Sequence, residues 1–229
     1  MKITKMQGIS LIDYPDKLSC LLFLSGCNLA CPFCQNPDLV KGEGEGLDFA
    51  RIIEEIEKRK RFIGGVVITG GEPTIHSDLP LLCKKIKEMG LAVKLDTNGY
   101  LSEALKSLIT EGVVDYIALD IKASLANLKK ACGREIEAEK IRETIGFLIS
   151  SRVEYELRTT CVPTIIDEEE IEKIGIEIQG AKRWFLQQFQ NKKTLDPDFM
   201  KIMPYSAEYL LGLKEIAKRY VESVEIRGL

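Results

Sequence analysis

Three cysteines at C-x3-C-x2-C spacing, Cys27, Cys31 and Cys34, constrain this chain more than any other feature. The loops between them are too short for disulfide geometry. Three thiolates this close in sequence can converge on one metal centre of zinc, copper(I) or an iron–sulfur cluster. A structural zinc or cluster site normally has four protein ligands. A cubane cluster held by three cysteines keeps one iron open, and an open position indicates chemistry at the metal.

The composition is that of an ordinary globular chain. Its 229 residues, 45% of them hydrophobic and 29% charged, suit one α/β domain. A net charge of −3 argues against a nucleic-acid partner, which would favour a basic patch. The longest apolar run, over 18–26, is too short to span a membrane, and the first six residues show no signal peptide. We therefore expect neither a nucleic-acid nor a membrane partner.

The other four cysteines are scattered, and each sits in or beside an apolar segment. We expect them to be buried small hydrophobes, as free cysteines usually are. The odd total of seven cysteines indicates a reducing compartment, so a cytoplasmic location is expected. The four are Cys20, Cys83, Cys132 and Cys161.

Strands and helices alternate from residue 18 onward. The apolar run over 18–25 predicts a strand buried on both faces. Asp48 is the expected N-cap of a helix over 49–62. Further strands are expected over 66–69, 92–95, 116–120, 153–161, 184–189 and 224–226. Further helices are expected over 79–89, 102–110, 125–149, 168–178 and 206–220.

This alternation predicts right-handed βαβ units and a parallel sheet. About six units follow from the pattern, whereas a full (β/α)8 barrel typically needs about 250 residues. We therefore expect an α/β fold of the open, partial TIM barrel type, about (βα)6. A single domain is expected over 1–229, with its core at about 18–190 and a C-terminal helix and short extension over 191–229.

Polar or glycine-rich residues follow each predicted strand. In parallel α/β folds the active site lies at the carboxyl ends of the strands, so these residues are expected to converge. Taken singly, each motif has a plain structural interpretation, such as a turn at a glycine pair or a solvated ion pair. The candidate site residues are Gly70, Gly71, Glu72, Pro73, Asp96, Thr97, Asn98, Asp120, Lys122, Arg158 and Gln187.

Together these motifs resemble the radical S-adenosylmethionine (SAM) superfamily, whose hallmark is C-x3-C-x-aromatic-C with Phe33 as the aromatic here. The segment 70–73 resembles the glycine-rich motif that binds the SAM amino group. Segments 96–99 and 120–122 resemble motifs of glycyl-radical-enzyme activases that bind SAM and, in some members, a monovalent cation. The stretches 10–17, 23–29 and 34–37 are similar to the activating proteins of anaerobic ribonucleoside-triphosphate reductase.

The resemblance implies that Cys27, Cys31 and Cys34 hold a [4Fe–4S] cluster whose open iron binds SAM. A reduced flavodoxin- or ferredoxin-type protein would supply one electron, and SAM would split into methionine and a 5′-deoxyadenosyl radical. That radical would take a hydrogen atom from a glycine of anaerobic ribonucleotide reductase. Phe33 and the strand-end residues would bind the cofactor, and no catalytic residue is implied beyond the cluster and SAM.

The chain departs from the family pattern at three places. Gln35 stands where many activases have a histidine. Asp16 stands where the family usually has glycine before Lys17. Gln187 and Gln188 stand where some activases use a histidine to contact SAM. The single histidine, His76, matches no catalytic position and is expected in a surface loop.

Two alternatives stay open from the sequence. A radical SAM enzyme of this kind could act on another glycyl-radical enzyme or on a small molecule. A zinc-binding interaction module could use the three cysteines with Cys20 or His76 as the fourth ligand. Structural zinc sites usually show paired C-x2-C motifs, and only one such pair is present here.

Overall fold

The computed structural model describes residues 1–229. Eight strands form one sheet and follow one another in chain order from β1 to β8. The expected open α/β architecture is confirmed. The strands are β1 (Ile3–Ser10), β2 (Ser19–Leu24), β3 (Gly65–Gly70), β4 (Ala92–Thr97), β5 (Tyr116–Asp120), β6 (Glu154–Cys161), β7 (Arg183–Gln188) and β8 (Ser223–Arg227).

Helices connect the strands, as the alternating pattern predicted. None of them is long and apolar enough to cross a membrane. The α-helices are α1 (Pro37–Val40), α2 (Phe49–Arg59), α3 (Leu79–Glu88), α4 (Ser102–Thr110), α5 (Leu128–Cys132), α6 (Ala138–Ser150), α7 (Glu168–Glu177) and α8 (Ala207–Ala217). Two 3-10 helices, η1 (Pro73–Ile75) and η2 (Pro197–Lys201), lie between them.

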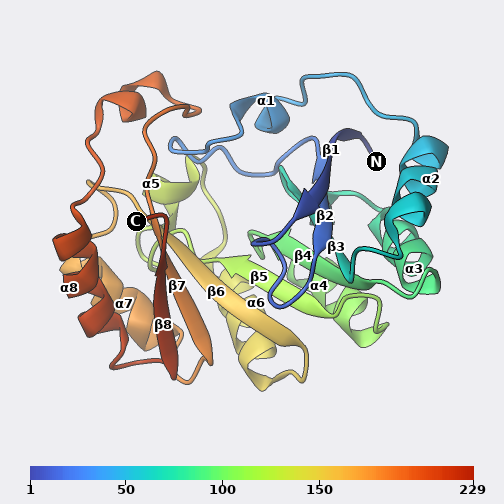
Figure 1. Cartoon of the computed structure of the whole chain (residues 1–229). Coiled ribbons are helices and arrows are strands. Elements are labelled where there is room, and N and C mark those ends of the chain that lie inside the picture. Colours follow the sequence, from blue (N-terminus) through green and yellow to red (C-terminus); the bar gives the residue numbers. More distant parts are fainter. The chain divides into compact units, whose positions relative to one another are not determined.

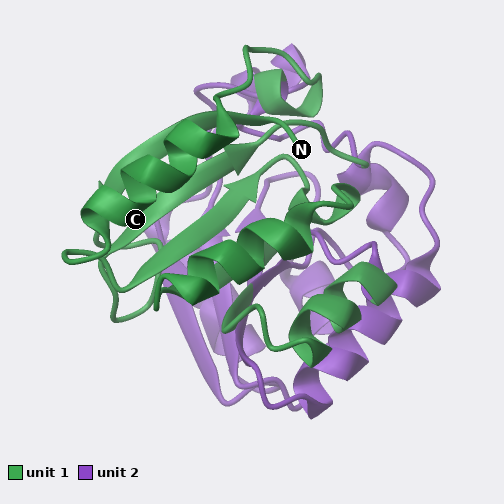
Figure 2. Cartoon of the chain, turned by 90° about the vertical axis from the view of Figure 1, so that its right-hand side faces the viewer, with its two compact units in different colours: residues 1–28, 38–97, 103–117 green, residues 29–37, 98–102, 118–229 purple.

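The chain divides into two compact units, coloured separately in Figure 2. Unit 1 comprises residues 1–28, 38–97 and 103–117, and unit 2 comprises residues 29–37, 98–102 and 118–229. Strand β5 begins in unit 1 and ends in unit 2. The expectation of a single domain over 1–229 stays a prediction.

In unit 1, strands β2, β3 and β4 are parallel, with Ser19 opposite Gly65 and Leu24 opposite Gly70. This register makes β2 and β3 end at the same level. Helix α2 begins as predicted, because the Asp48 side chain accepts a hydrogen bond from the Arg51 amide.

Strand β1 was not predicted. It pairs antiparallel with β2, with Ile3 opposite Leu24 and Met6 opposite Leu22. Its alternation places polar residues such as Lys5 and Gln7 on the more exposed face, which weakened the apolar signal. The sheet is therefore mostly parallel with one antiparallel edge strand.

The turn between β1 and β2 is anchored by one aromatic side chain. Tyr14 is buried with Leu21 and Val67, and its ring centroid lies 5.9 Å from that of Tyr116. In the same turn Asp16 adopts φ +59°, a left-handed conformation that favours glycine. This backbone geometry explains why a glycine suits the position that Asp16 occupies.

In unit 2, strands β6, β7 and β8 are parallel, with Leu157 opposite Trp184 and Arg183 opposite Ser223. Helix α8 packs against α7 and β8, which are drawn in orange to red in Figure 1. Trp184 is fully buried, and its indole N–H donates to Thr159 Oγ1 at 3.0 Å.

The four cysteines outside the motif are all buried, which confirms the prediction that they are buried small hydrophobes.

Candidate active site

The glycine pair after β3 lies directly against the end of β2. The Gly71 amide donates to the Leu24 carbonyl, and the Glu72 amide donates to the Gly26 carbonyl, both at 2.8 Å. A Cβ at Gly70 would lie 2.4 Å from the Leu24 carbonyl oxygen, and one at Gly71 would lie 1.9 Å from the Gly26 oxygen. Only glycine allows this approach of two backbones. The contact fixes the residue that precedes Cys27.

The buried carboxylate of Glu72 accepts several hydrogen bonds inside unit 1. Its Oε1 accepts hydrogen bonds from the Thr74 amide at 3.0 Å, the Thr74 hydroxyl at 2.5 Å and the Thr97 hydroxyl at 2.7 Å. All three side chains are buried. The carboxylate thus joins the loop after β3 to the end of β4, two of the motifs that the sequence predicted to act together.

The remaining candidates near β4 also have partners of their own. Lys94 Nζ lies 2.9 Å from Asp96 Oδ1 in an ion pair that is largely buried. Asn98 Oδ1 accepts a hydrogen bond from the Tyr100 amide at 3.0 Å. Pro73 is buried at the start of η1. Their contacts with a cofactor stay predictions.

The cysteine loop over 29–37 belongs to unit 2 and is held by its backbone. The Cys34 amide donates to the Cys31 carbonyl at 3.0 Å, which closes a turn. The Asp196 amide donates to the Pro32 carbonyl at 2.9 Å. The Asn36 amide points at Cys34 Sγ from 3.4 Å. Burial raises the pKa of Cys34, and the Asn36 amide directed at its sulfur opposes this rise in part.

Phe33 packs inside unit 2. Its ring centroid lies 6.5 Å from that of Phe199 in η2, and its side chain is buried. The aromatic of the cysteine motif therefore anchors the loop to η2. A contact between Phe33 and a cofactor stays a prediction.

Cys132 at the end of α5 was expected to be only a buried hydrophobe, but it also contacts a candidate ligand. Its thiol is hydrogen-bonded with Cys31, and this bond, followed by burial, raises the pKa of Cys31. The adjacent backbone is tied as well, because the Ala30 amide donates to the Cys132 carbonyl at 2.9 Å. No spacing in the sequence relates Cys132 to the cysteine motif.

Asp120 lies between two cations at the end of β5. Its Oδ2 is 2.8 Å from Lys122 Nζ, and its Oδ1 is 2.8 Å from Arg158 Nε. Burial opposes ionisation, but Arg158 and Lys122 outweigh it and lower the pKa of Asp120 to about 2. Burial likewise opposes the charge of Lys122, and Asp120 and Cys31 outweigh it, which raises the pKa of Lys122. The three predicted residues thus form one charged group.

The last predicted residue, Gln187, lies at the end of β7 and is partly buried. Its neighbour Gln188 donates to the Tyr205 carbonyl at 2.7 Å. A role of Gln187 in binding SAM stays a prediction.

His76 is not simply a surface residue. It is partly buried, and its Nε2 lies 3.0 Å from the carbonyl oxygen of Ser25, two residues before Cys27. Burial lowers the pKa of His76. The histidine therefore helps to hold the segment that leads into the cysteine motif.

The cysteine side chains have the donor chemistry that the implied cluster needs, and binding of the cluster and of SAM by the candidate residues stays a prediction. Cys27, Cys31 and Cys34 are in reduced form and supply the soft sulfur donors that iron–sulfur clusters require. Cys27 belongs to unit 1 and follows Gly26, the residue that contacts Gly71. Cys31 and Cys34 lie in the loop of unit 2 that also contains Phe33.

The sequence profile described as "Radical SAM superfamily" matches residues 21–175. This range contains all three cysteines and every candidate residue except Gln187. The chain therefore belongs to the radical SAM superfamily, whose members are enzymes that use a [4Fe–4S] cluster together with SAM.

Its relatives place it among glycyl-radical-enzyme activating enzymes. It is 36% identical over 233 residues to a protein of Methanocaldococcus jannaschii provisionally named glycyl-radical enzyme activating enzyme MJ1227, covering 99% of this chain and 96% of that protein. It is 27% identical to the pyruvate formate-lyase-activating enzyme of Listeria monocytogenes, covering 98% and 90%. Enzymes of this group act on a glycyl-radical protein.

Solved structures agree on the fold. SuiB of Streptococcus suis bound to S-adenosylmethionine superposes with a TM-score of 0.67 at 18% identity, covering 91% of this chain. The chain spans about half the length of that protein, 52%. At this identity the likeness shows the fold alone, and it agrees with the predicted open, partial TIM barrel.

Proposed function

We propose that this enzyme installs a glycyl radical on anaerobic ribonucleoside-triphosphate reductase. The observation that carries the proposal is the three-cysteine motif in a chain that matches activating enzymes along 99% of its length. The choice of reductase is supported by the resemblance of segments 10–17, 23–29 and 34–37 to its activating proteins. In the overall reaction one electron, SAM and a glycine residue give methionine, 5′-deoxyadenosine and the glycyl radical.

Most of the candidate residues have a role in this proposal. Cys27, Cys31 and Cys34 hold the [4Fe–4S] cluster. The cluster and SAM, when bound, supply the electron transfer and carbon–sulfur bond cleavage on which the reaction depends. Because the Gly71 and Glu72 amides are used inside the protein, the backbone carbonyls of the glycine motif are the groups suited to the SAM ammonium.

The charged and polar residues orient the nucleoside end of SAM. Asp120, kept ionised by two cations, is an acceptor for a ribose hydroxyl or a counter-charge for the sulfonium. Asp96, Asn98 and Gln187 complete the set of polar groups. Glu72 and Thr97 position the two motifs without contacting SAM, since both side chains are buried and hydrogen-bonded to each other.

The electron donor in this proposal is a reduced flavodoxin- or ferredoxin-type protein, and the reaction takes place in the cytoplasm. Seven free cysteines support a reducing location. The oxygen sensitivity of a three-cysteine cluster fits an anaerobic setting.

A second candidate partner is pyruvate formate-lyase. It is favoured by the similarity to the Listeria activating enzyme along almost the whole chain. Both candidates need the same SAM cleavage, so only the protein substrate separates them.

The reconstituted enzyme, SAM and dithionite should be incubated anaerobically with each purified glycyl-radical protein in turn. A glycyl radical signal in electron paramagnetic resonance on the ribonucleotide reductase, with little on pyruvate formate-lyase, is the expected result. The reverse pattern would establish pyruvate formate-lyase as the partner. SAM cleavage with no radical on either protein would favour a different substrate, and a small molecule would then be the first to test.

A further inference from the structure

The backbone of helix α5 is hydrogen-bonded to the backbone of the cysteine loop. The Ala30 amide donates to the Cys132 carbonyl at 2.9 Å. Gly133 follows at φ +64°, and a Cβ there would lie 2.1 Å from the Ala30 carbonyl oxygen. The end of α5 therefore lies immediately beside Cys31.

The outer side of α5 is a cationic surface. Leu128, Ala131 and Cys132 are buried, and the side chains on the other face are exposed. We call Lys129, Lys130 and Arg134 the α5 surface. They line a surface pocket of about 470 Å³ together with Ala126, Asn127 and Gly133.

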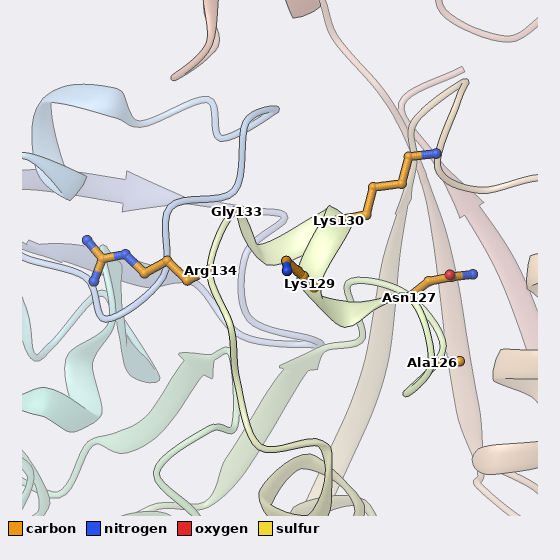
Figure 3. A pocket seen from close by; sticks show the side chains of 6 residues that line it. All are labelled: Ala126, Asn127, Lys129, Lys130, Gly133 and Arg134. Atoms are coloured by element: carbon orange, nitrogen blue, oxygen red, sulfur yellow. The ribbon is translucent and has the colours of Figure 1, made fainter.

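The cationic side chains of the α5 surface spread outward. Figure 3 shows Lys130, on the helix, and Arg134, just after it, extending in different directions. Such a spread does not hold one small anion. It suits a broad acidic surface on another protein.

The charge of this segment contrasts with the rest of the chain. Residues 126–135 contain three basic residues and one acidic residue, whereas the whole chain has a net charge of −3. Lys129 pairs with Glu135, but both side chains are highly exposed, so the pair contributes little and can exchange partners. Lys130 donates to the Thr164 carbonyl, which leaves its positive charge without neutralisation by that contact.

The other basic run of the chain is different. Lys58, Arg59 and Lys60 each form an ion pair with a glutamate of the same helix, α2. That run therefore presents mixed charge, which makes it a suitable control surface.

We propose that the α5 surface docks a small acidic electron-transfer protein, which reduces the cluster held in part by Cys31. The proposal rests on the proposed function, because only a redox-active cluster needs a donor. In each encounter the donor loses one electron and the cluster gains it. Redox partners use small, transient interfaces, and complementary charge raises their rate of association.

The test compares two variants that lose the same charge. One carries Lys129→Gln, Lys130→Gln and Arg134→Gln, and the control carries Lys58→Gln, Arg59→Gln and Lys60→Gln. Reduction of the reconstituted cluster by a reduced acidic ferredoxin is followed by stopped-flow absorbance at low ionic strength. SAM cleavage driven by dithionite is measured in parallel, since dithionite needs no docking surface.

The α5 variant should be reduced about tenfold more slowly than the wild type at an ionic strength of about 0.01 M. The difference should shrink as salt is added, and the control should match the wild type. Dithionite-driven SAM cleavage should be equal in all three proteins.

Equal ferredoxin-driven rates in the wild type and the α5 variant would overturn the proposal. Loss of glycyl radical formation in the α5 variant with dithionite as reductant would also overturn it, because the surface would then bind the protein substrate. Absence of SAM cleavage by the wild type with dithionite contradicts the proposed function itself and so removes the basis for a donor site.

Discussion

The Thr97 hydroxyl donates a 2.7 Å hydrogen bond to Oε1 of Glu72. Both side chains are buried, and the same oxygen also accepts from the amide and hydroxyl of Thr74. A residue after β3 and a residue at the end of β4 thus share one carboxylate. These contacts inside the protein hold the two motifs in register.

Removing the Thr97 hydroxyl should destabilise the protein. Thr97→Val keeps the shape of the side chain but takes one donor from a buried carboxylate, so the free energy of unfolding should fall by about 1–3 kcal/mol. Urea denaturation measures the change. Thr110→Val at the exposed end of α4 should stay within about 0.5 kcal/mol of the wild type. Equal effects of the two substitutions would contradict the role of the Thr97–Glu72 bond.

Gly71→Ala should damage the site more than its small size suggests. The added Cβ would meet the Gly26 carbonyl oxygen at 1.9 Å, so the segment leading into Cys27 must move. We expect lower iron content after anaerobic reconstitution and a loss of more than about 2 kcal/mol in unfolding free energy. Gly146→Ala in α6, where the new Cβ meets nothing within 4 Å, should instead stabilise the protein by about 0.5–1 kcal/mol. Unchanged iron content in Gly71→Ala would contradict the close contact.

Asp120→Asn should lower stability in a pH-dependent manner. The pKa of Asp120 is depressed in the folded protein, so its ionised form stabilises the native state above about pH 4. That contribution is lost as the pH falls toward about 2. At pH 7 the variant should be less stable by about 1–3 kcal/mol, because Lys122 and Arg158 lose their shared partner.

Urea denaturation at several pH values between about 7 and 2 tests this prediction. The gap between the wild type and Asp120→Asn should close as the pH is lowered through the unfolded and folded pKa values. A gap that stays constant over this range would show that ionisation of Asp120 does not stabilise the fold.

Asp16→Gly should stabilise the protein. Asp16 has φ +59°, where an L-residue is strained by about 1–2 kcal/mol and glycine is not. The greater freedom of glycine in the unfolded chain offsets about 0.5–1 kcal/mol of this strain, which leaves a gain of up to about 1.5 kcal/mol. Thermal unfolding measures it, with Asp16→Ala as the control that keeps a Cβ and should not gain. A lower midpoint for Asp16→Gly than for the wild type would be the opposite of the expected result.

The parallel strands could be predicted because their signal is local. The run before Cys27 and the strand ending at Asp120 are short, apolar and bounded by turns. The antiparallel strand β1 could not be predicted, because its own residues Lys5 and Gln7 are exposed and the strand is recognised only by its pairing with β2. Pairing between distant segments leaves no local pattern in a single sequence.

Some contacts among the candidate residues could be predicted from the sequence, whereas their roles in binding stay predictions. Asp120, Lys122 and Arg158 do meet, as expected for residues at neighbouring strand ends. The sequence could not show that the Glu72 and Thr97 side chains bond to each other inside the protein, because these residues meet only when the loop after β3 packs beside the end of β4. Nor could it show that Cys132 lies against Cys31, since α5 returns to the cysteine loop only through tertiary packing.

Anaerobic reconstitution with iron and sulfide, followed by a SAM cleavage assay, tests the central claim most directly. The wild type should bind about four irons per chain and, once reduced, convert SAM to 5′-deoxyadenosine and methionine. Cys31→Ala should lose both properties, whereas Cys161→Ala, at a buried cysteine outside the motif, should keep them. A colourless wild-type protein that holds one zinc ion and leaves SAM intact would contradict the account.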